Sequence, residues 1–187
     1  MYNLNDNFKD VALSIERAGI TDFLSWLFNK TDFLIAPAST KYHGNYEGGL
    51  VEHSLAVYNR LISDVDALHN YSMNTLKIVS LFHDVCKANF YSTYKRNVKN
   101  TETGIWESVD AYKICEDYPY GGHGSKSVFL IMQHGLKITD EEAAAINTHM
   151  GGWDATTYSN PSGAFNKFPL AVLLHIADMK ATYLDKK

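Results

Sequence analysis

A histidine and an aspartate stand side by side at the end of an apolar stretch, in residues 81–87 (LFHDVCK). Apolar positions around the pair recur at three- and four-residue intervals, as on the buried side of a helix: Leu76, Val79, Phe82 and Cys86. His83 fits this spacing and is expected to face the same interior. Burying an imidazole beside a carboxylate is costly unless something pairs with them, and a metal ion is the commonest such partner.

Two more residues of ligand type occupy buried positions on other predicted helices. His53 follows Leu50 by three residues and precedes Val57 by four. Asp178 follows Leu174 by four residues on the last predicted helix. A single histidine on an apolar face is more often a packed core residue than a ligand. The prediction of a metal site therefore rests on four ligand-type residues occurring together. The predicted ligand set is His53, His83, Asp84 and Asp178.

Two imidazoles and two carboxylates suit a divalent transition metal, namely Mn²⁺, Fe²⁺, Co²⁺, Ni²⁺ or Zn²⁺. Such a set leaves coordination positions open for water or for a phosphate oxygen. A bound ion of this kind lowers the pKa of water to roughly 7–9, which makes hydroxide available near neutral pH. The predicted chemistry is therefore hydrolysis.

The order His53, His83-Asp84, Asp178 resembles the H…HD…D signature of the HD-domain superfamily of metal-dependent phosphohydrolases. Residues 43–53 (HGNYEGGLVEH) also resemble the HxxYxGGLxEH segment of one branch. That branch includes HD-type 3′-to-5′ exoribonucleases and many small phage-encoded HD proteins. The resemblance covers about residues 43–184, and it implies a helical fold and hydrolysis at phosphorus.

The resemblance also draws attention to His123 and His149. HD proteins with the longer pattern H…HD…H…H…D resemble dinuclear phosphodiesterases, in which the added histidines bind a second metal and the HD aspartate bridges the two ions. This implies one or two ions per chain, with Asp84 as the bridge. The alternatives for His123 and His149 are phosphate contact, a structural role or, as a catalytic residue, general acid.

Several residues near the pair are candidates for contacts to the substrate. Lys87 follows Asp84 by three residues, where the related HD-x-x-K pattern uses a lysine against phosphate. Its alternative is a lysine favoured by a helix end. The aromatic and cationic residues that follow could hold a base and phosphates, or equally decorate a hairpin: Tyr91, Tyr94, Lys95 and Arg96. The glycine-rich segment 121–126 (GGHGSK) could offer backbone N–H groups to a phosphate.

The remaining histidines and Glu52 have weaker claims to a role in the site. His43 and Glu52 either orient His53 through its other ring nitrogen or belong to a loop. His175 is expected to pack in the core or to support a ligand. His69 and His134 are expected at the surface.

The predicted elements are mainly helices, at about residues 5–17, 21–28, 49–65, 76–86, 125–133, 140–150 and 169–184. Thr139 and Glu142 form a predicted capping box for the sixth of these. Residues 89–112 lack helical spacing and are rich in Tyr, Thr and Val, which favours a hairpin or an irregular excursion. The expected fold class is all-α: a compact HD-domain helical bundle with a small β-hairpin-like insertion near 90–112.

The chain of 187 residues is expected to form one domain, 1–187. In this arrangement helices within 5–30 pack on an HD core at about 43–184. A net charge of −4 gives no global attraction to nucleic acid or an anionic membrane. No apolar stretch approaches a membrane span, and the start of the chain lacks signal-peptide character, so a cytoplasmic protein with reduced cysteines is expected. The apolar N-terminal segment suggests a homodimer contact.

Three functions are consistent with these patterns. The first is a metal-dependent phosphohydrolase acting on a nucleotide or a small nucleotide-derived phosphate, favoured because the chain is little more than the predicted catalytic domain. The second is a phosphodiesterase or 3′–5′ nuclease with a dinuclear site, for which short single-stranded nucleic acid is the partner. The third is a non-catalytic nucleotide sensor, which the complete ligand set disfavours.

Overall fold

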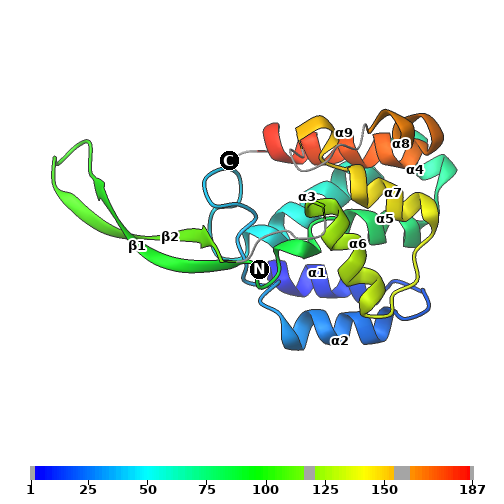
Figure 1. The fold of residues 1–187 in the computed structure, drawn as a ribbon, viewed down its shortest axis with the longest axis horizontal. Coiled ribbons are helices and arrows are strands. Elements are labelled where there is room, and N and C mark those ends of the chain that lie inside the picture. Colours follow the sequence, from blue (N-terminus) through cyan, green and yellow to red (C-terminus); the bar gives the residue numbers. More distant parts are fainter. Residues whose placement is uncertain (1–2, 116–120, 154–160, 186–187) are drawn as a thin grey trace.

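The structure, a computed structural model, describes residues 3–115, 121–153 and 161–185. Two 3-10 turns, η1 (Val85–Lys87) and η2 (Gly151–Trp153), and two strands, β1 (Tyr91–Lys99) and β2 (Trp106–Ile114), accompany the helices. The helices are α1 (Leu4–Leu13), α2 (Ile20–Lys30), α3 (Gly49–Ile62), α4 (Val65–Asn70), α5 (Met73–Phe82), α6 (His123–Gln133), α7 (Asp140–Thr148), α8 (Ser162–Lys167) and α9 (Pro169–Tyr183). The helices gather in one body, and the strands project from it as a long arm (Figure 1).

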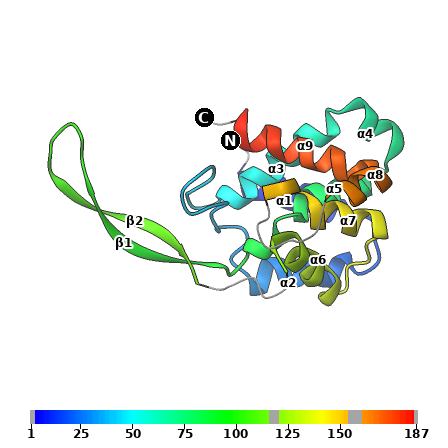
Figure 2. The same cartoon turned by 45° about the horizontal axis from the view of Figure 1, so that its top comes forward.

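The helical body is organised around α3, which packs against both α5 and α9. From α9 the packing continues through α7 to α6, and α6 in turn contacts η1 just after α5 (Figure 2). Buried apolar side chains fill the spaces between these helices, including Leu50, Val57, Phe82, Ile146 and Leu174. This circuit of helices encloses the region toward which the predicted ligands point.

The N-terminal helices α1 and α2 cover the outer side of α5. Phe23 of α2 packs edge-to-face on Phe82 with ring centroids 4.8 Å apart, and Phe8 of α1 packs on the same ring at 6.5 Å. Each fully buried phenylalanine contributes roughly 1.5–3 kcal/mol. These contacts fix the end of α5, where His83 and Asp84 follow.

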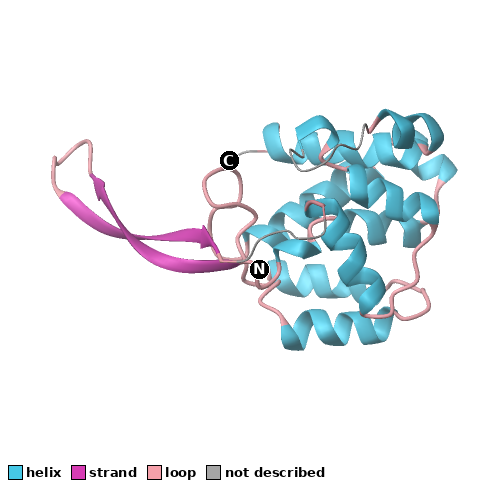
Figure 3. Cartoon of the chain, viewed as in Figure 1, coloured by secondary structure: helices cyan, strands magenta, loops and turns pink. Residues whose placement is uncertain are grey.

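The prediction of an all-α class is wrong, because the insertion forms a regular antiparallel sheet. Strands β1 and β2 pair over nine residues each, from Tyr91 opposite Ile114 to Lys99 opposite Trp106 (Figure 3). Aromatic and β-branched residues favour extended backbone here, and the Asn100 side chain accepts hydrogen bonds from the N–H groups of Glu102 and Thr103 in the turn. The described chain is therefore a mixed structure, a helical body with a β-hairpin arm.

Several predicted helix boundaries also need correction. α1 ends at Leu13 rather than Arg17, and Gly19 adopts a left-handed conformation immediately before α2. The short helices α4 and α8 were not predicted. The capping box of α7 is confirmed, since Thr139 and Glu142 exchange the two expected hydrogen bonds.

No helix among the described residues is both long and apolar enough to cross a membrane.

Candidate metal centre

Six side chains of ligand type converge from separate segments of the helical body. His53 lies within α3 and Asp178 within α9, while His123 is the first residue of α6. His83 and His149 occupy the C-terminal caps of α5 and α7. Five of the six are buried, and the His123 side chain is 14% exposed. The structure therefore brings together every residue that the sequence predicted as a ligand.

The sixth residue, Asp84, lies where the chain leaves the helix. α5 ends at Phe82, and Asp84 has φ −106° and ψ 18° before the η1 turn begins. The sequence predicted that this helix would continue through Cys86, whereas in the structure it ends at Phe82. Because the chain turns here, the side chains of Asp84 and Lys87 lie on the same side and contact each other.

Two of the histidines are held in the tautomer that binds metal. The Nδ1–H of His83 donates to the Ser80 carbonyl at 2.8 Å, and the Nδ1–H of His149 donates to the Ile146 carbonyl at 2.7 Å. A neutral imidazole whose Nδ1 carries the proton presents a lone pair at Nε2. In both residues Nε2 faces the centre of the cluster.

The first group of ligands consists of His53, His83 and Asp178. His53 Nε2 lies 3.2 Å from His83 Nε2 and 3.1 Å from Asp178 Oδ1. Three atoms that all can act as acceptors repel one another unless a proton or a cation lies among them. One ligand atom from each residue lies within 4.8 Å of the others, so this group could hold a metal ion.

The two oxygens of Asp84 face different pairs of histidines. Oδ2 lies 3.5 Å from His83 Nε2 and 3.6 Å from His53 Nε2. Oδ1 lies 3.1 Å from His123 Nε2 and 3.5 Å from His149 Nε2. A carboxylate with this arrangement can contribute one oxygen to each of two neighbouring ions.

Two buried atoms of the cluster have incomplete hydrogen bonding among the described residues. Among the described residues, Asp84 Oδ1 and His149 Nε2 make no well-aligned hydrogen bond, although His123 Nε2 is close to the former. Each buried polar atom left unsatisfied costs about 1–3 kcal/mol. Both atoms offer a lone pair, so a cation between them would be attracted to both, whereas a further hydrogen-bond acceptor would be repelled.

The charges of the cluster favour ionised carboxylates. Burial alone would raise the pKa of Asp84, but Lys87, His83 and His123 hold it well below its usual value. Burial would likewise raise the pKa of Asp178, and His53 lowers it below its usual value. Burial would lower the pKa of His123, but Cys86 and Asp84 raise it to about 10. At neutral pH the cluster therefore offers two carboxylates, and in the absence of metal His123 holds a proton.

Lys87, the predicted phosphate contact, is tied to the aspartate. Its Nζ donates to Asp84 Oδ2 at 2.6 Å, and the residue is only 8% exposed. Burial would lower the pKa of Lys87, but Asp84 raises it above its usual value. The lysine therefore balances the charge of Asp84 as well as lining the cavity described below.

The predicted substrate contacts on the hairpin are spread along the arm. Tyr91 is half-buried at its base, and burial raises the pKa of Tyr91 to about 12. Tyr94, Lys95 and Arg96 lie further out and are exposed, and Lys95 pairs with Asp110 across the strands at 2.8 Å. None of the four lines either of the two cavities described below, and neither does segment 121–126.

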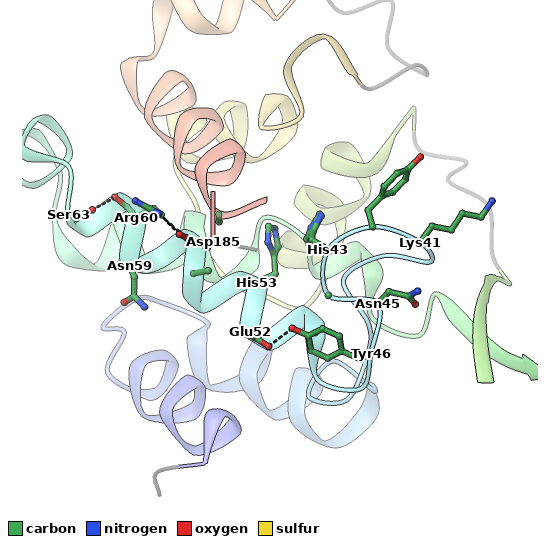
Figure 4. A pocket seen from close by; sticks show the side chains of 15 residues that line it. Lys41, His43, Asn45, Tyr46, Glu52, His53, Asn59, Arg60, Ser63 and Asp185 are labelled. Carbon is green, nitrogen blue, oxygen red and sulfur yellow. Dashed lines mark hydrogen bonds and ion pairs between the residues drawn. The ribbon is translucent and has the colours of Figure 1, made fainter. Parts of the chain in front are cut away.

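The ligand cluster opens into a cavity of about 250 Å³ that includes Lys87, Met150, His175 and Met179 in its lining. A larger groove of about 830 Å³ adjoins it and follows α3 toward Arg60. Tyr42, His43 and His53 line both spaces. Figure 4 shows His43 and His53 side by side between Lys41 on one side and the Arg60–Asp185 ion pair on the other.

His175 was expected to pack in the core or to support a ligand and contacts the backbone of a ligand residue, whereas the contact made by Cys86 was not predicted. His175 donates its Nδ1–H to the His149 carbonyl at 2.6 Å and lines the smaller cavity. Cys86 had been counted only as a core position, yet its Sγ lies 3.2 Å from His123 Nδ1.

Glu52 accepts a hydrogen bond from the Tyr46 hydroxyl at 2.6 Å. His43 packs on the His53 ring with centroids 4.7 Å apart.

Comparison of the chain with protein-family models, with curated proteins and with solved structures finds no match. The candidate site is therefore defined by its own residues. Buried His, Asp and Cys groups in the described chain could hold a metal ion.

Proposed function

We propose that this protein is a metal-dependent phosphohydrolase that uses two divalent ions bridged by Asp84. The observation that carries the proposal is the division of the Asp84 oxygens between two pairs of histidines, at 3.1–3.6 Å. His53, His83 and Asp178 would hold one ion, and His123 with His149 the other. Mixed nitrogen and oxygen ligands suit Mn²⁺, Fe²⁺, Co²⁺, Ni²⁺ or Zn²⁺.

When bound, such ions supply hydroxide near neutral pH and neutralise charge on a phosphate. The protein side chains provide the setting for this chemistry. Lys87 keeps Asp84 ionised, and the backbone carbonyls of Ser80 and Ile146 orient His83 and His149. The burial of the ligand side chains limits the access of bulk water to them, which strengthens each of these interactions.

His43 is suited to contact the substrate by hydrogen bonding. Both of its ring nitrogens are buried and have no hydrogen-bond partner among the described residues. Burial and the neighbouring His53 and Lys87 charges lower the pKa of His43 to about 4, so the ring is neutral at pH 7. A neutral imidazole at the junction of the two cavities can donate to or accept from a sugar or base once the ring turns a nitrogen toward the cavity.

The first candidate substrate is a nucleotide or a small nucleotide-derived phosphoester. The second candidate is a phosphodiester, which the size of the groove favours. The cavity at the ligands, about 250 Å³, has room for little more than a phosphate and a sugar. The adjoining 830 Å³ can hold a second nucleoside, with the amides of Asn45 and Asn59 and the ring of Tyr42 in its lining. A dinucleotide or short single strand would fill both spaces, whereas a nucleoside monophosphate would place at most its base in the groove.

The test is hydrolysis by protein reconstituted with each of the five metals. Nucleoside monophosphates, dinucleotides and bis(p-nitrophenyl) phosphate are compared as substrates. We expect the wild type to hydrolyse a substrate with at least one metal. Turnover should be at least about 100-fold lower in Asp84→Asn. It should be unchanged in the control Asp110→Asn, which alters a carboxylate on the exposed arm. Turnover of dinucleotides but not monophosphates selects the diesterase. Metal binding without turnover of any substrate would contradict the proposal and favour a sensor.

A further inference from the structure

Cys86 is a buried thiol at the edge of the candidate metal centre. It lies in the η1 turn between Asp84 and Lys87 and is fully inaccessible to solvent. Its Sγ is 3.2 Å from Nδ1 of His123, on the far side of that ring from Asp84. The proposed function assigns no role to this contact.

The contact occupies a position that main-chain carbonyls fill at the other histidines. Nδ1 of His83 and of His149 each face a carbonyl three residues earlier, supplied by the helix that each histidine ends. His123 instead begins α6, so no earlier turn of its own helix supplies such a carbonyl. At His123 the Cys86 sulfur, from a segment 37 residues earlier, lies at the Nδ1 position.

The geometry distinguishes an orienting role for Cys86 from a ligand role. Ligand atoms from Asp84, Cys86 and His123 do lie within 4.8 Å of one another. However, Asp84 Oδ1 faces Nε2 of His123, whereas the sulfur faces Nδ1. An ion shared by Asp84 and His123 would sit at the Nε2 edge, away from the sulfur.

The backbone of Cys86 is itself anchored to the helix that carries His123. The Cys86 N–H donates to Ser127 Oγ at 3.2 Å, and Ser127 is fully buried on α6 one turn after His123. This bond fixes η1 against α6, which sets the position of the sulfur relative to the imidazole.

We infer that Cys86 is a positioning residue: its sulfur accepts a hydrogen bond from the Nδ1–H of His123 and so directs the Nε2 lone pair toward Asp84 Oδ1 and His149. This inference rests on the proposed dinuclear site. Partners that orient a metal ligand typically change metal affinity by roughly 10–100-fold when removed. The expected loss is confined to the ion held by His123 and His149.

The variants Cys86→Ala and Cys86→Ser test this role, with Cys115→Ser as a control at the other, exposed cysteine. Isothermal titration with Mn²⁺ or Zn²⁺ alone measures the affinity of each ion. We expect the wild type to bind two ions and Cys86→Ala to bind the second ion about 10–100-fold more weakly. Cys86→Ser should recover affinity toward the wild-type value, because the hydroxyl still accepts a hydrogen bond. Cys115→Ser should bind both ions as the wild type does. Two ions bound with wild-type affinity by Cys86→Ala would overturn the inference alone.

A measurement on the wild type keeps the test valid if Cys86→Ala fails to fold. Long-range ¹H–¹⁵N spectra of the Zn²⁺-loaded protein report which ring nitrogen of each histidine is protonated. We expect His123 to carry its proton on Nδ1, and a proton on Nε2 would overturn the inference. A wild type that binds fewer than two ions would instead overturn the dinuclear proposal and, with it, this role of Cys86.

Discussion

His53 Nε2 and His83 Nε2 lie 3.2 Å apart in the buried space between α3 and the end of α5. The proton of His83 is on Nδ1, which faces the Ser80 carbonyl, so its Nε2 presents a lone pair toward His53. His53 Nε2 must also accommodate Asp178 Oδ1 at 3.1 Å. A divalent cation between these atoms satisfies all three at once, whereas a single proton satisfies two.

Metal binding should therefore stabilise the fold measurably. A ligand present at 100 times its Kd stabilises the native state by about 2.7 kcal/mol. For a domain of this size that corresponds to a rise in Tm of roughly 5–10 °C. Thermal melts with Mn²⁺ and with a chelator measure the difference, and His53→Ala should reduce it. Equal Tm values with and without metal would contradict the site.

Replacing Asp84 should remove metal and leave a buried charge uncompensated. Asp84→Asn loses the bridging carboxylate, so we expect metal content to fall from two ions per chain to none. The variant also leaves Lys87 without its counter-charge, and breaking a buried pair in this way costs about 3–5 kcal/mol. Elemental analysis and urea unfolding of metal-free protein measure the two effects.

The double variant Asp84→Asn/Lys87→Met separates these effects. Methionine fills similar space without a charge, so stability should recover while metal content stays at zero. If the single variant were as stable as the metal-free wild type, the close contact of Lys87 with Asp84 would contribute little.

Gly124 should control the approach of His123 to His149. A Cβ at this position would lie 2.6 Å from the Ile146 carbonyl oxygen and 2.4 Å from that of Asn147, so α6 would have to move away from the end of α7. We expect Gly124→Ala to cost about 1–3 kcal/mol and to weaken the ion held by the two histidines. Gly163→Ala in α8 is the control, because nothing lies near its Cβ position and alanine favours helix there.

The buried pair of Arg17 and Glu142 should make stability fall in acid. Their side chains are 2.8 Å apart. Burial alone would raise the pKa of Glu142, but the hydrogen bond from Arg17 holds it below its usual 4.5. Because the folded pKa is the lower one, the stabilisation is fully present above pH 4.5 and is lost as the pH falls through the folded value.

Urea unfolding between pH 3 and pH 7 compares the wild type with Glu142→Gln. The variant should be less stable at pH 7 by about 1–3 kcal/mol, and the gap should close in acid. Glu102→Gln, in the exposed turn of the arm, should behave as wild type. A gap that is constant with pH would exclude the ionised pair as its cause.

The spacing of residues could predict the ligands that lie on regular helices. His53 and Asp178 follow the apolar period of α3 and α9, so their burial could be predicted from the neighbouring residues. His123 and His149 occupy helix ends, where no period applies, and only the order of residues in a family resemblance pointed to them. All six lie in one cluster in the structure.

Features that depend on contacts between distant segments could not be predicted in this way. Packing of η1 on α6 stabilises the end of the helix before Asp84. The apolar spacing continues past this point to Cys86, so the sequence alone predicts an unbroken helix. For the same reason Cys86 resembled a core residue, since its contact with His123 joins segments 37 residues apart. The hairpin was predicted near residues 90–112 and is found at 91–114, but the all-α class was wrong because its two strands form a regular nine-residue antiparallel sheet.

The projecting arm has a consequence for the behaviour of the molecule in solution. Nine residues per strand at about 3.3 Å each give a length of roughly 30 Å. A compact chain of 187 residues has a radius of gyration of about 16 Å. An arm longer than that radius adds hydrodynamic drag and makes rotational diffusion anisotropic. The protein should therefore sediment more slowly than a sphere of 21.1 kDa, and its small-angle scattering should show a tail of long interatomic distances.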